Sequence, residues 1–366
     1  MVTIISALIV SFIVGFLLVR LQSLHQHFTG DHDLSGVQKF HAISVPRVGG
    51  LAILAGMLCG ILSRWTVNGP IMQFGLLILV SASPVFVAGF VEDVTKKVGV
   101  KVRLLCAAAS GILAGYFFDA WLVDLQFFGL DALLQIPVVS VIFTAFAVAG
   151  VTNAFNIIDG YNGLVGVVSA VILLALAYVG FQVQDYAVMA SCLAAFGAIL
   201  GFLFWNYPKG LIFLGDGGAY LIGFLVAELS ILLVIRNPQV SKWFPVLLCF
   251  YPIFETLFTI YRRLMLKKGG VGHPDSAHLH QIIYKRVVRL SVIRGDAQSL
   301  TQRNSMTSPY LWVLSSLAVL PALLFWQYKV VLQFFIALFA VTYVWLYWSI
   351  IHFKVPKWML LKSVNR

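Results

Sequence analysis

Long apolar runs alternate with short polar segments along almost the whole chain. Eleven such runs begin near residues 1, 48, 71, 103, 133, 163, 186, 211, 242, 310 and 329. A helix needs about 20 apolar residues to cross a bilayer. The first run, 1–19, has no basic leader and no small-residue cleavage site, so we expect a retained helix. The pattern predicts an all-α integral membrane protein of about eleven transmembrane helices, with residues 1–366 forming one polytopic membrane domain.

The composition excludes the soluble and disordered classes. Hydrophobic residues make up 60% of the chain, and Asp, Glu, Lys and Arg only 11%, whereas about 25% charge is usual in soluble proteins. A disordered chain would need low hydrophobicity and high charge. The four cysteines lie in apolar runs without a CxxC pair, so we predict no redox or zinc site.

Positive charge falls mainly on one side of the predicted spans. All but four of the 25 Lys and Arg residues lie there, the exceptions being Arg64, Arg236, Lys242 and Lys329. The positive-inside rule makes the rich side cytoplasmic. The N-terminus is then external or periplasmic, and the C-terminus is cytoplasmic. Because this asymmetry explains the net charge of +11, we predict no nucleic-acid partner.

The polar segments outside the spans differ in their expected importance. Residues 262–309 form the one long polar stretch, which we predict to be a cytoplasmic loop between spans nine and ten that contributes to the active site. On the external side we expect solvated acidic residues without function, namely Asp119, Asp124, Asp131 and Asp185.

Acidic residues gather in three loops of the predicted cytoplasmic face. They are Glu92-Asp93, the segment 153–160 (NAFNIIDG) and the segment 213–218 (FLGDGG). Hard cations such as Mg²⁺ take carboxylate and amide oxygens and keep waters and substrate phosphates in their other positions. Asp159, Asp216 and Asn156 offer that ligand set, and neighbouring glycines allow a phosphate ligand to approach the backbone. The GDGG segment lacks the Gly-Lys-Ser/Thr ending of a Walker loop. We therefore predict one shared metal and phosphate site.

Basic side chains near these loops are candidates for phosphate binding. Lys96 and Lys97 are explained by the positive-inside rule alone. Arg103 opens the fourth span, where it either snorkels to the interface or reaches the acidic site. His278 and His280 alternate around Leu279 in a polar loop, and this pairing favours a role in the site.

Five ordered motifs resemble those of the polyprenyl-phosphate N-acetylhexosamine-1-phosphate transferases. This family, glycosyltransferase family 4, includes the bacterial undecaprenyl-phosphate GlcNAc-1-phosphate transferases that start O-antigen, enterobacterial common antigen and teichoic acid synthesis. The matching segments are Lys39-Phe-His41 with Pro46-Arg47-Val-Gly-Gly, Glu92-Asp93 with Arg103-Leu-Leu, NAFNIIDGYNGL at 153–164, FLGDGG at 213–218 and HPDSAHLHQ at 273–281.

The resemblance implies transfer of an N-acetylhexosamine 1-phosphate from a UDP-sugar to undecaprenyl phosphate, with release of UMP. It implies Mg²⁺ as cofactor, with Mn²⁺ as a substitute, and a multi-pass enzyme of the bacterial inner membrane with a cytoplasmic active site. Asp216 and Asn156 would be the metal ligands. The catalytic carboxylates would be Asp93, which deprotonates or orients the lipid phosphate, Glu92 and Asp159. The substrate-binding residues would be Lys39, Arg103, Asn153, Asn156, His278 and His280.

The sequence departs from the commoner family pattern at a few positions. These are Glu92, where Asp is usual, and Asn162, Ser276 and Gln281. The departures near the histidines leave the sugar open among GlcNAc, GalNAc, FucNAc and QuiNAc, together with the polysaccharide pathway. The choice of a one-step or a two-step mechanism and of a monomer or a homodimer is also open.

Two other functional classes compete with this interpretation. A transporter or channel would use intramembrane carboxylates, and only Glu228 and Glu255 come near mid-span. A non-catalytic membrane scaffold would need no glycine-flanked acidic loops. Among enzymes, a muramoyl-pentapeptide transferase shares the fold but usually carries a longer histidine run.

Overall fold

The computed structural model describes residues 1–30, 45–65, 67–127, 129–266, 277–288 and 297–352. Each predicted apolar run contains a helix. In chain order they are α1 (Val2–Arg20), α3 (Gly49–Leu62), α4 (Gly69–Thr95), α5 (Val100–Phe118), α7 (Pro137–Ile157), α8 (Leu164–Gln182), α9 (Tyr186–Asn206), α10 (Gly215–Arg236), α11 (Trp243–Leu248) with α12 (Phe250–Leu266), α15 (Ala297–Leu324) and α16 (Lys329–Ile351).

The helical membrane fold predicted from the sequence is confirmed for the described residues. Nine of their helices are long and apolar enough to cross a membrane. Of the other predicted spans, α3 has 14 residues and the ninth is divided at Cys249 into α11 and α12. The count of eleven and the orientation of the termini stay predictions. No strand occurs in this part of the chain, where a single β-bridge joins Gly30 and Pro46.

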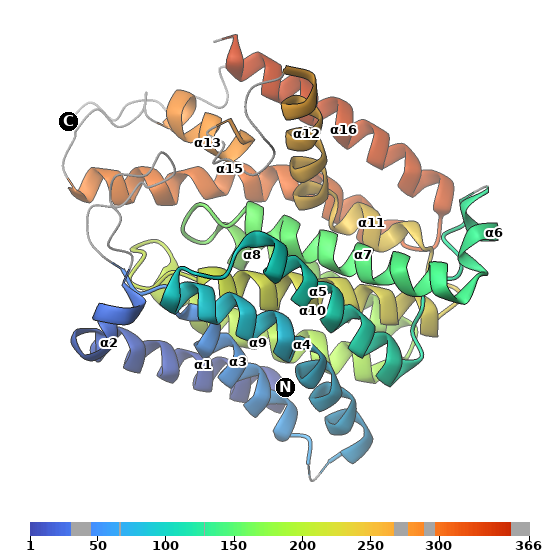
Figure 1. Ribbon diagram of the computed structural model, residues 1–366, viewed down its shortest axis with the longest axis horizontal. Helices are drawn as coiled ribbons and strands as arrows, with labels where there is room; N and C mark the ends of the chain where they lie inside the picture. Colours follow the sequence, from blue (N-terminus) through green and yellow to red (C-terminus); the bar gives the residue numbers. More distant parts are fainter. Residues whose placement is uncertain (31–44, 66, 128, 267–276, 289–296, 353–366) are drawn as a thin grey trace.

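The long helices form a bundle around α10, whose side chains are nearly all buried. Most helices run roughly along one direction, while α12 crosses them steeply (Figure 1). One end of the bundle, at the left of Figure 1, carries α2 (Gln22–Thr29) and α13 (Leu279–Ile283), and the other end carries α6 (Leu130–Leu134). A charged site therefore has a natural place at an end of the bundle, where polar groups avoid the bilayer centre.

The predicted cytoplasmic loop 262–309 is largely helical where the structure describes it. α12 continues to Leu266, α13 is followed by a π-helical turn over Tyr284–Val288, and α15 begins at Ala297. The sequence underestimated these helices because their polar residues interrupt the apolar pattern.

Two of the aspartates that we predicted to be external have structural partners, and one of them, Asp185, is buried instead of solvated. Asp185 is 7% exposed, accepts the Val188 N–H at the start of α9 and pairs with Arg236 at 2.7 Å. The Asp131 carboxylate accepts the N–H groups of Leu125 and Phe127 at 2.8 and 2.9 Å. Unpaired N–H groups at helix starts and turns need acceptors, and short acidic side chains supply them.

Candidate active site

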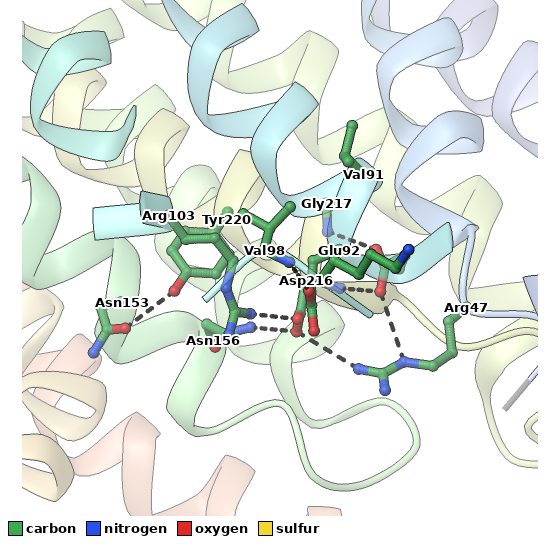
Figure 2. A network of polar contacts seen from close by, with 12 residues as sticks. Arg47, Val91, Glu92, Val98, Arg103, Asn153, Asn156, Asp216, Gly217 and Tyr220 are labelled. Atoms are coloured by element: carbon green, nitrogen blue, oxygen red, sulfur yellow. Dashed lines mark hydrogen bonds and ion pairs between the residues drawn. The ribbon is translucent and has the colours of Figure 1, made fainter. Parts of the chain in front are cut away.

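Asp216, in the first turn of α10, is the centre of the polar network in Figure 2. Its Oδ1 accepts a hydrogen bond from Asn156 Nδ2 at 2.9 Å, and its Oδ2 accepts one from Arg103 Nη1. Arg47 Nη2 lies 3.6 Å from Oδ1. The side chains come from α7, α5 and the segment before α3, so segments far apart in the sequence meet at one carboxylate.

Asp93, near the end of α4, holds the beginning of α10 in place. Its Oδ1 accepts the Asp216 N–H and its Oδ2 accepts the Gly217 N–H, both at 2.8 Å. These are N–H groups that lack partners within the helix, and a carboxylate there also matches the helix dipole. Arg47 Nε lies 3.7 Å from Asp93 Oδ1. Asp93 is 1% exposed, so its position fixes Asp216, while its action on the lipid phosphate stays a prediction.

Glycines bring the two acidic segments into contact. Gly215 has φ of 75°, and a Cβ there would lie 2.2 Å from the Arg47 carbonyl oxygen and 2.6 Å from Asp93 Oδ2. A Cβ at Gly50 would lie 2.5 Å from the Gly218 nitrogen. The backbones are joined here, because Gly49 N–H donates to Phe213 O and Gly50 N–H to Leu214 O. The GDGG segment thus depends on glycine for contact with the neighbouring backbone, and the predicted approach of a phosphate ligand to these glycines stays a prediction.

Glu92 and Asn153 have other partners than Asp216. Glu92 Oε2 accepts the Val98 N–H at 2.6 Å and closes the turn between α4 and α5. Within the described part of the chain it makes no bond to the arginine–aspartate network, so its predicted catalytic role has no direct geometric support. Asn153 Oδ1 accepts the Tyr220 hydroxyl at 3.2 Å, and Arg103 lies over the Tyr220 ring at 5.5 Å. Asn153 and Arg103 therefore do not bond to each other directly, but both contact the side chain of Tyr220 (Figure 2).

Asp159 follows α7 and interacts with Arg47, the arginine that also pairs with Asp93 and Asp216. Burial raises the pKa of Asp159 to about 7, Arg47 lowers it, and Asp216 and Asp93 raise it. The loop that follows is fixed by side chains of other helices. Gly163 N–H donates to Asn206 at 2.6 Å, and Asn162 N–H donates to Asn304 of α15 at 2.8 Å. The loop after Asp159 is thus held against α9 and α15.

His278 and His280 are brought together at the start of α13. Their rings stack with centroids 5.2 Å apart, and the His280 ring lies 5.6 Å from that of Tyr161. A Cβ at Gly160 would lie 3.4 Å from His280. The histidine pair therefore packs against the loop that carries Asp159, as one shared site requires.

The carboxylates that favoured a transporter are both buried. Glu255 accepts hydrogen bonds from Tyr343 and Leu279 and contacts His278. Glu228 is 1% exposed and has no hydrogen-bond partner among the described residues. Glu255 therefore belongs to the histidine cluster.

One predicted site residue lies outside the described residues, and one important residue was missed. Lys39 lies outside the described residues, so its role stays a prediction. Arg47 is the residue that was missed. Its motif was noted, but the role of its side chain, which lies between Asp93 and Asp216, was not predicted. The signal was present in the glycine pairs 49–50 and 217–218, which predict a close backbone contact next to Arg47.

The ligand set fits Mg²⁺ only with help from substrate. Among the described residues no group of three His, Cys, Asp or Glu side chains is placed to hold a metal. Mg²⁺ is commonly bound by one or two carboxylates with substrate phosphates and water. Asp216 and Asn156, which are adjacent and partly exposed, supply oxygen ligands of that kind.

Comparisons with known proteins agree with the motifs. Residues 75–234 match the family model of glycosyl transferase family 4. The chain is 28% identical over 284 residues to a Bacillus subtilis protein named "Probable undecaprenyl-phosphate N-acetylglucosaminyl 1-phosphate transferase", covering 76% of this chain and 77% of that protein. It is 26% identical over 275 residues to the Thermotoga maritima undecaprenyl-phosphate alpha-N-acetylglucosaminyl 1-phosphate transferase, covering 75% and 80%.

A more distant relative carries a different donor in its name. The phospho-N-acetylmuramoyl-pentapeptide-transferase of Streptococcus sanguinis is 25% identical over 226 residues, which cover 60% of this chain and 66% of that protein. Together these matches confirm the family resemblance drawn from the motifs.

Proposed function

From the match of residues 75–234 to glycosyl transferase family 4, we propose that this chain is a transferase that moves an N-acetylhexosamine 1-phosphate from a UDP-sugar to undecaprenyl phosphate. The names of the relatives support undecaprenyl phosphate as acceptor. The observation that carries the proposal is Asp216, held among Asn156, Arg47 and Arg103 where four of the motifs meet. A carboxylate flanked by arginines suits a metal-assisted reaction between two phosphates.

The reaction proposed is a phosphoryl transfer. In the overall reaction, a bond between an oxygen of the lipid phosphate and the β-phosphorus of the donor replaces the bond from that phosphorus to the bridging oxygen. UMP leaves with the bridging oxygen, and the sugar phosphate stays on the lipid. Phosphoryl transfer depends mainly on positioning and charge neutralisation, and Arg47 and Arg103 provide cations for the diphosphate.

Further polar groups of the site have roles in this scheme. Mg²⁺, held by Asp216 and Asn156 and by the donor diphosphate, would neutralise the charge that develops on the phosphate oxygens. Asp93 keeps Asp216 at the start of α10. Burial raises the pKa of Asp159 to about 7, which suits a proton acceptor or a support of the nucleotide. His278 and His280 would hold the sugar phosphate.

The membrane fits both substrates. The acceptor has an anionic head on a long apolar chain, so the site must lie where the bilayer meets water. Because the unequal Lys and Arg distribution predicts a cytoplasmic site, we place the reaction at the cytoplasmic face of the bacterial inner membrane. There it would start a cell-surface polysaccharide of the O-antigen, capsule or teichoic-acid type.

The test is a donor panel with purified protein in detergent. The protein is incubated with undecaprenyl phosphate and UDP-GlcNAc, UDP-GalNAc, UDP-FucNAc, UDP-QuiNAc or UDP-glucose, and UMP is measured with Mg²⁺, with Mn²⁺ and with EDTA. We expect UMP from an N-acetylated donor only, because a site that hydrogen-bonds a substrate amide rejects analogues without it. EDTA should abolish release. UDP as product, or turnover equal in EDTA, would overturn the proposal.

A further inference from the structure

Glu255, in the middle of α12, is a buried carboxylate with three hydrogen-bond donors. It is 1% exposed. Its Oε1 lies 3.0 Å from His278 Nδ1 and accepts the Leu279 N–H at 3.2 Å, while its Oε2 accepts the Tyr343 hydroxyl at 2.7 Å. The donors come from the start of α13 and from α16. Glu255 is therefore the group that ties α12, α13 and α16 together.

The contact determines which nitrogen of His278 bonds to Glu255 and which is left for another partner. A carboxylate oxygen only accepts, so the proton of this bond must be on Nδ1. The other nitrogen, Nε2, is then left for a partner outside the Glu255 contact. Thr259 Oγ1 also lies 3.2 Å from Nδ1, which further restricts the ring.

We propose that Glu255 is a positioning residue that holds His278 with Nδ1 protonated and Nε2 presented to the substrate phosphate, and that Tyr343 holds Glu255 in place. The proposal rests on the proposed function, in which His278 binds the sugar phosphate. It gives the last membrane helix a part in the active site. α16 also contacts the neighbouring backbone, because the Tyr347 hydroxyl donates to the Ala277 carbonyl at 3.1 Å.

The first test compares two buried glutamates. Glu255→Gln keeps the shape and the acceptor oxygen but removes the charge, and Glu228→Gln removes a charge from a site without a hydrogen-bond partner among the described residues. We expect kcat of Glu255→Gln to fall about 10- to 100-fold, as large as the loss when a metal-binding histidine loses the partner that orients it. Glu228→Gln should keep the wild-type kcat. Equal kcat values in Glu255→Gln and wild type would overturn the proposal.

The second test separates positioning from general stability. If Glu255 acts through His278, the double variant Glu255→Gln/His278→Asn should have the same kcat/KM as His278→Asn alone. Multiplying losses would contradict the proposal. Tyr343→Phe should lower kcat less than Glu255→Gln, and Tyr251→Phe, a buried tyrosine without a hydrogen-bond partner among the described residues, should not lower it. If Glu255→Gln does not fold, the comparison of Tyr343→Phe with Tyr251→Phe tests the proposal, and equal kcat values in these two variants would overturn it.

The third test does not depend on transferase activity. The ¹⁵N resonances of His278 are assigned in histidine-labelled protein by their loss in His278→Asn. In the wild type we expect a protonated Nδ1, and in Glu255→Gln a shift of both ring nitrogens. An unchanged spectrum would overturn the positioning role. An expected spectrum in a protein that releases no UMP would instead overturn the proposed function and leave the Glu255–His278 contact standing.

Discussion

The negative charge of Asp216 is paired with Arg47 and Arg103, which are also the cations proposed to bind the donor phosphates. Arg103 and Arg47 are 11% and 26% exposed at their side chains, and Asp216 is 15% exposed. Arginine forms strong charge-assisted hydrogen bonds with carboxylates and with phosphates alike, so the same arginines suit the phosphates of a donor. In the absence of substrate the two arginines pair with Asp216. When a donor binds, they can pair with its phosphates instead.

The position of Arg47 between the two aspartates predicts the effect of replacing it. Arg47→Gln removes the cation that lies between Asp93 and Asp216. We expect UMP release to fall about 10- to 100-fold, because an interaction with a charged group contributes about 1.5–3 kcal/mol. The matched control is Arg64→Gln, whose side chain donates to Thr3 elsewhere in the bundle. Equal rates for the two variants would show that Arg47 has no part in the site.

Most residues that the structure brings together were predicted from the sequence, but their partners were not. Asp93, Asp216, Asn156, Arg103 and the two histidines were found because each lies in a motif. Glu255 was weighed only as a transporter residue, since nothing in the spacing of an apolar helix shows that His278 packs on it. Contacts between segments 23 residues and more apart depend on tertiary packing, which a periodic pattern does not encode.

At the scale of elements, the contact between α4 and α10 positions the site. A Cβ at Gly89 would lie 2.7 Å from the Gly217 backbone, so the two helices touch without side chains between them. Small residues at such crossings are typical of membrane helices. This close approach is what lets Asp93 reach the first N–H groups of α10.

Gly89→Ala should separate the two helices. We expect a loss of about 1–3 kcal/mol in unfolding free energy, the usual cost of overpacking, together with weaker Mg²⁺-dependent UMP release. Gly150→Ala is the control, because nothing lies within 4 Å of a Cβ there. Thermal unfolding and UMP release of the two variants are compared. A Gly89→Ala protein as stable and active as Gly150→Ala would contradict the role of the crossing.

Helix positions followed well from apolar runs, while two structural details did not. The division of the ninth span at Cys249 and the steep direction of α12 (Figure 1) leave the hydropathy pattern unchanged. The helices α13 and α15 begin inside a polar stretch. Hydropathy reports burial from water, and these helices are held by polar contacts such as Glu255 with His278.

At the scale of the whole molecule, orientation decides which substrates reach the site. The predicted topology places Lys97 in the cytoplasm and Asp124 outside. We expect a membrane-impermeant maleimide to label Asp124→Cys in intact cells and Lys97→Cys only after lysis. The unmodified chain, with its four cysteines, measures background labelling. The reverse pattern would place the site on the external face and remove the access to cytosolic nucleotide sugars.

The central claim is that a phosphate passes to the lipid at Asp216. A donor labelled with ³²P at its β-phosphate is mixed with undecaprenyl phosphate, Mg²⁺ and either the wild-type protein or Asp216→Asn, which keeps the side-chain shape. We predict that the label enters the lipid fraction with an equal amount of UMP in the wild type, and that Asp216→Asn folds but transfers none. Label left in released UDP, or full transfer by Asp216→Asn, would contradict the account.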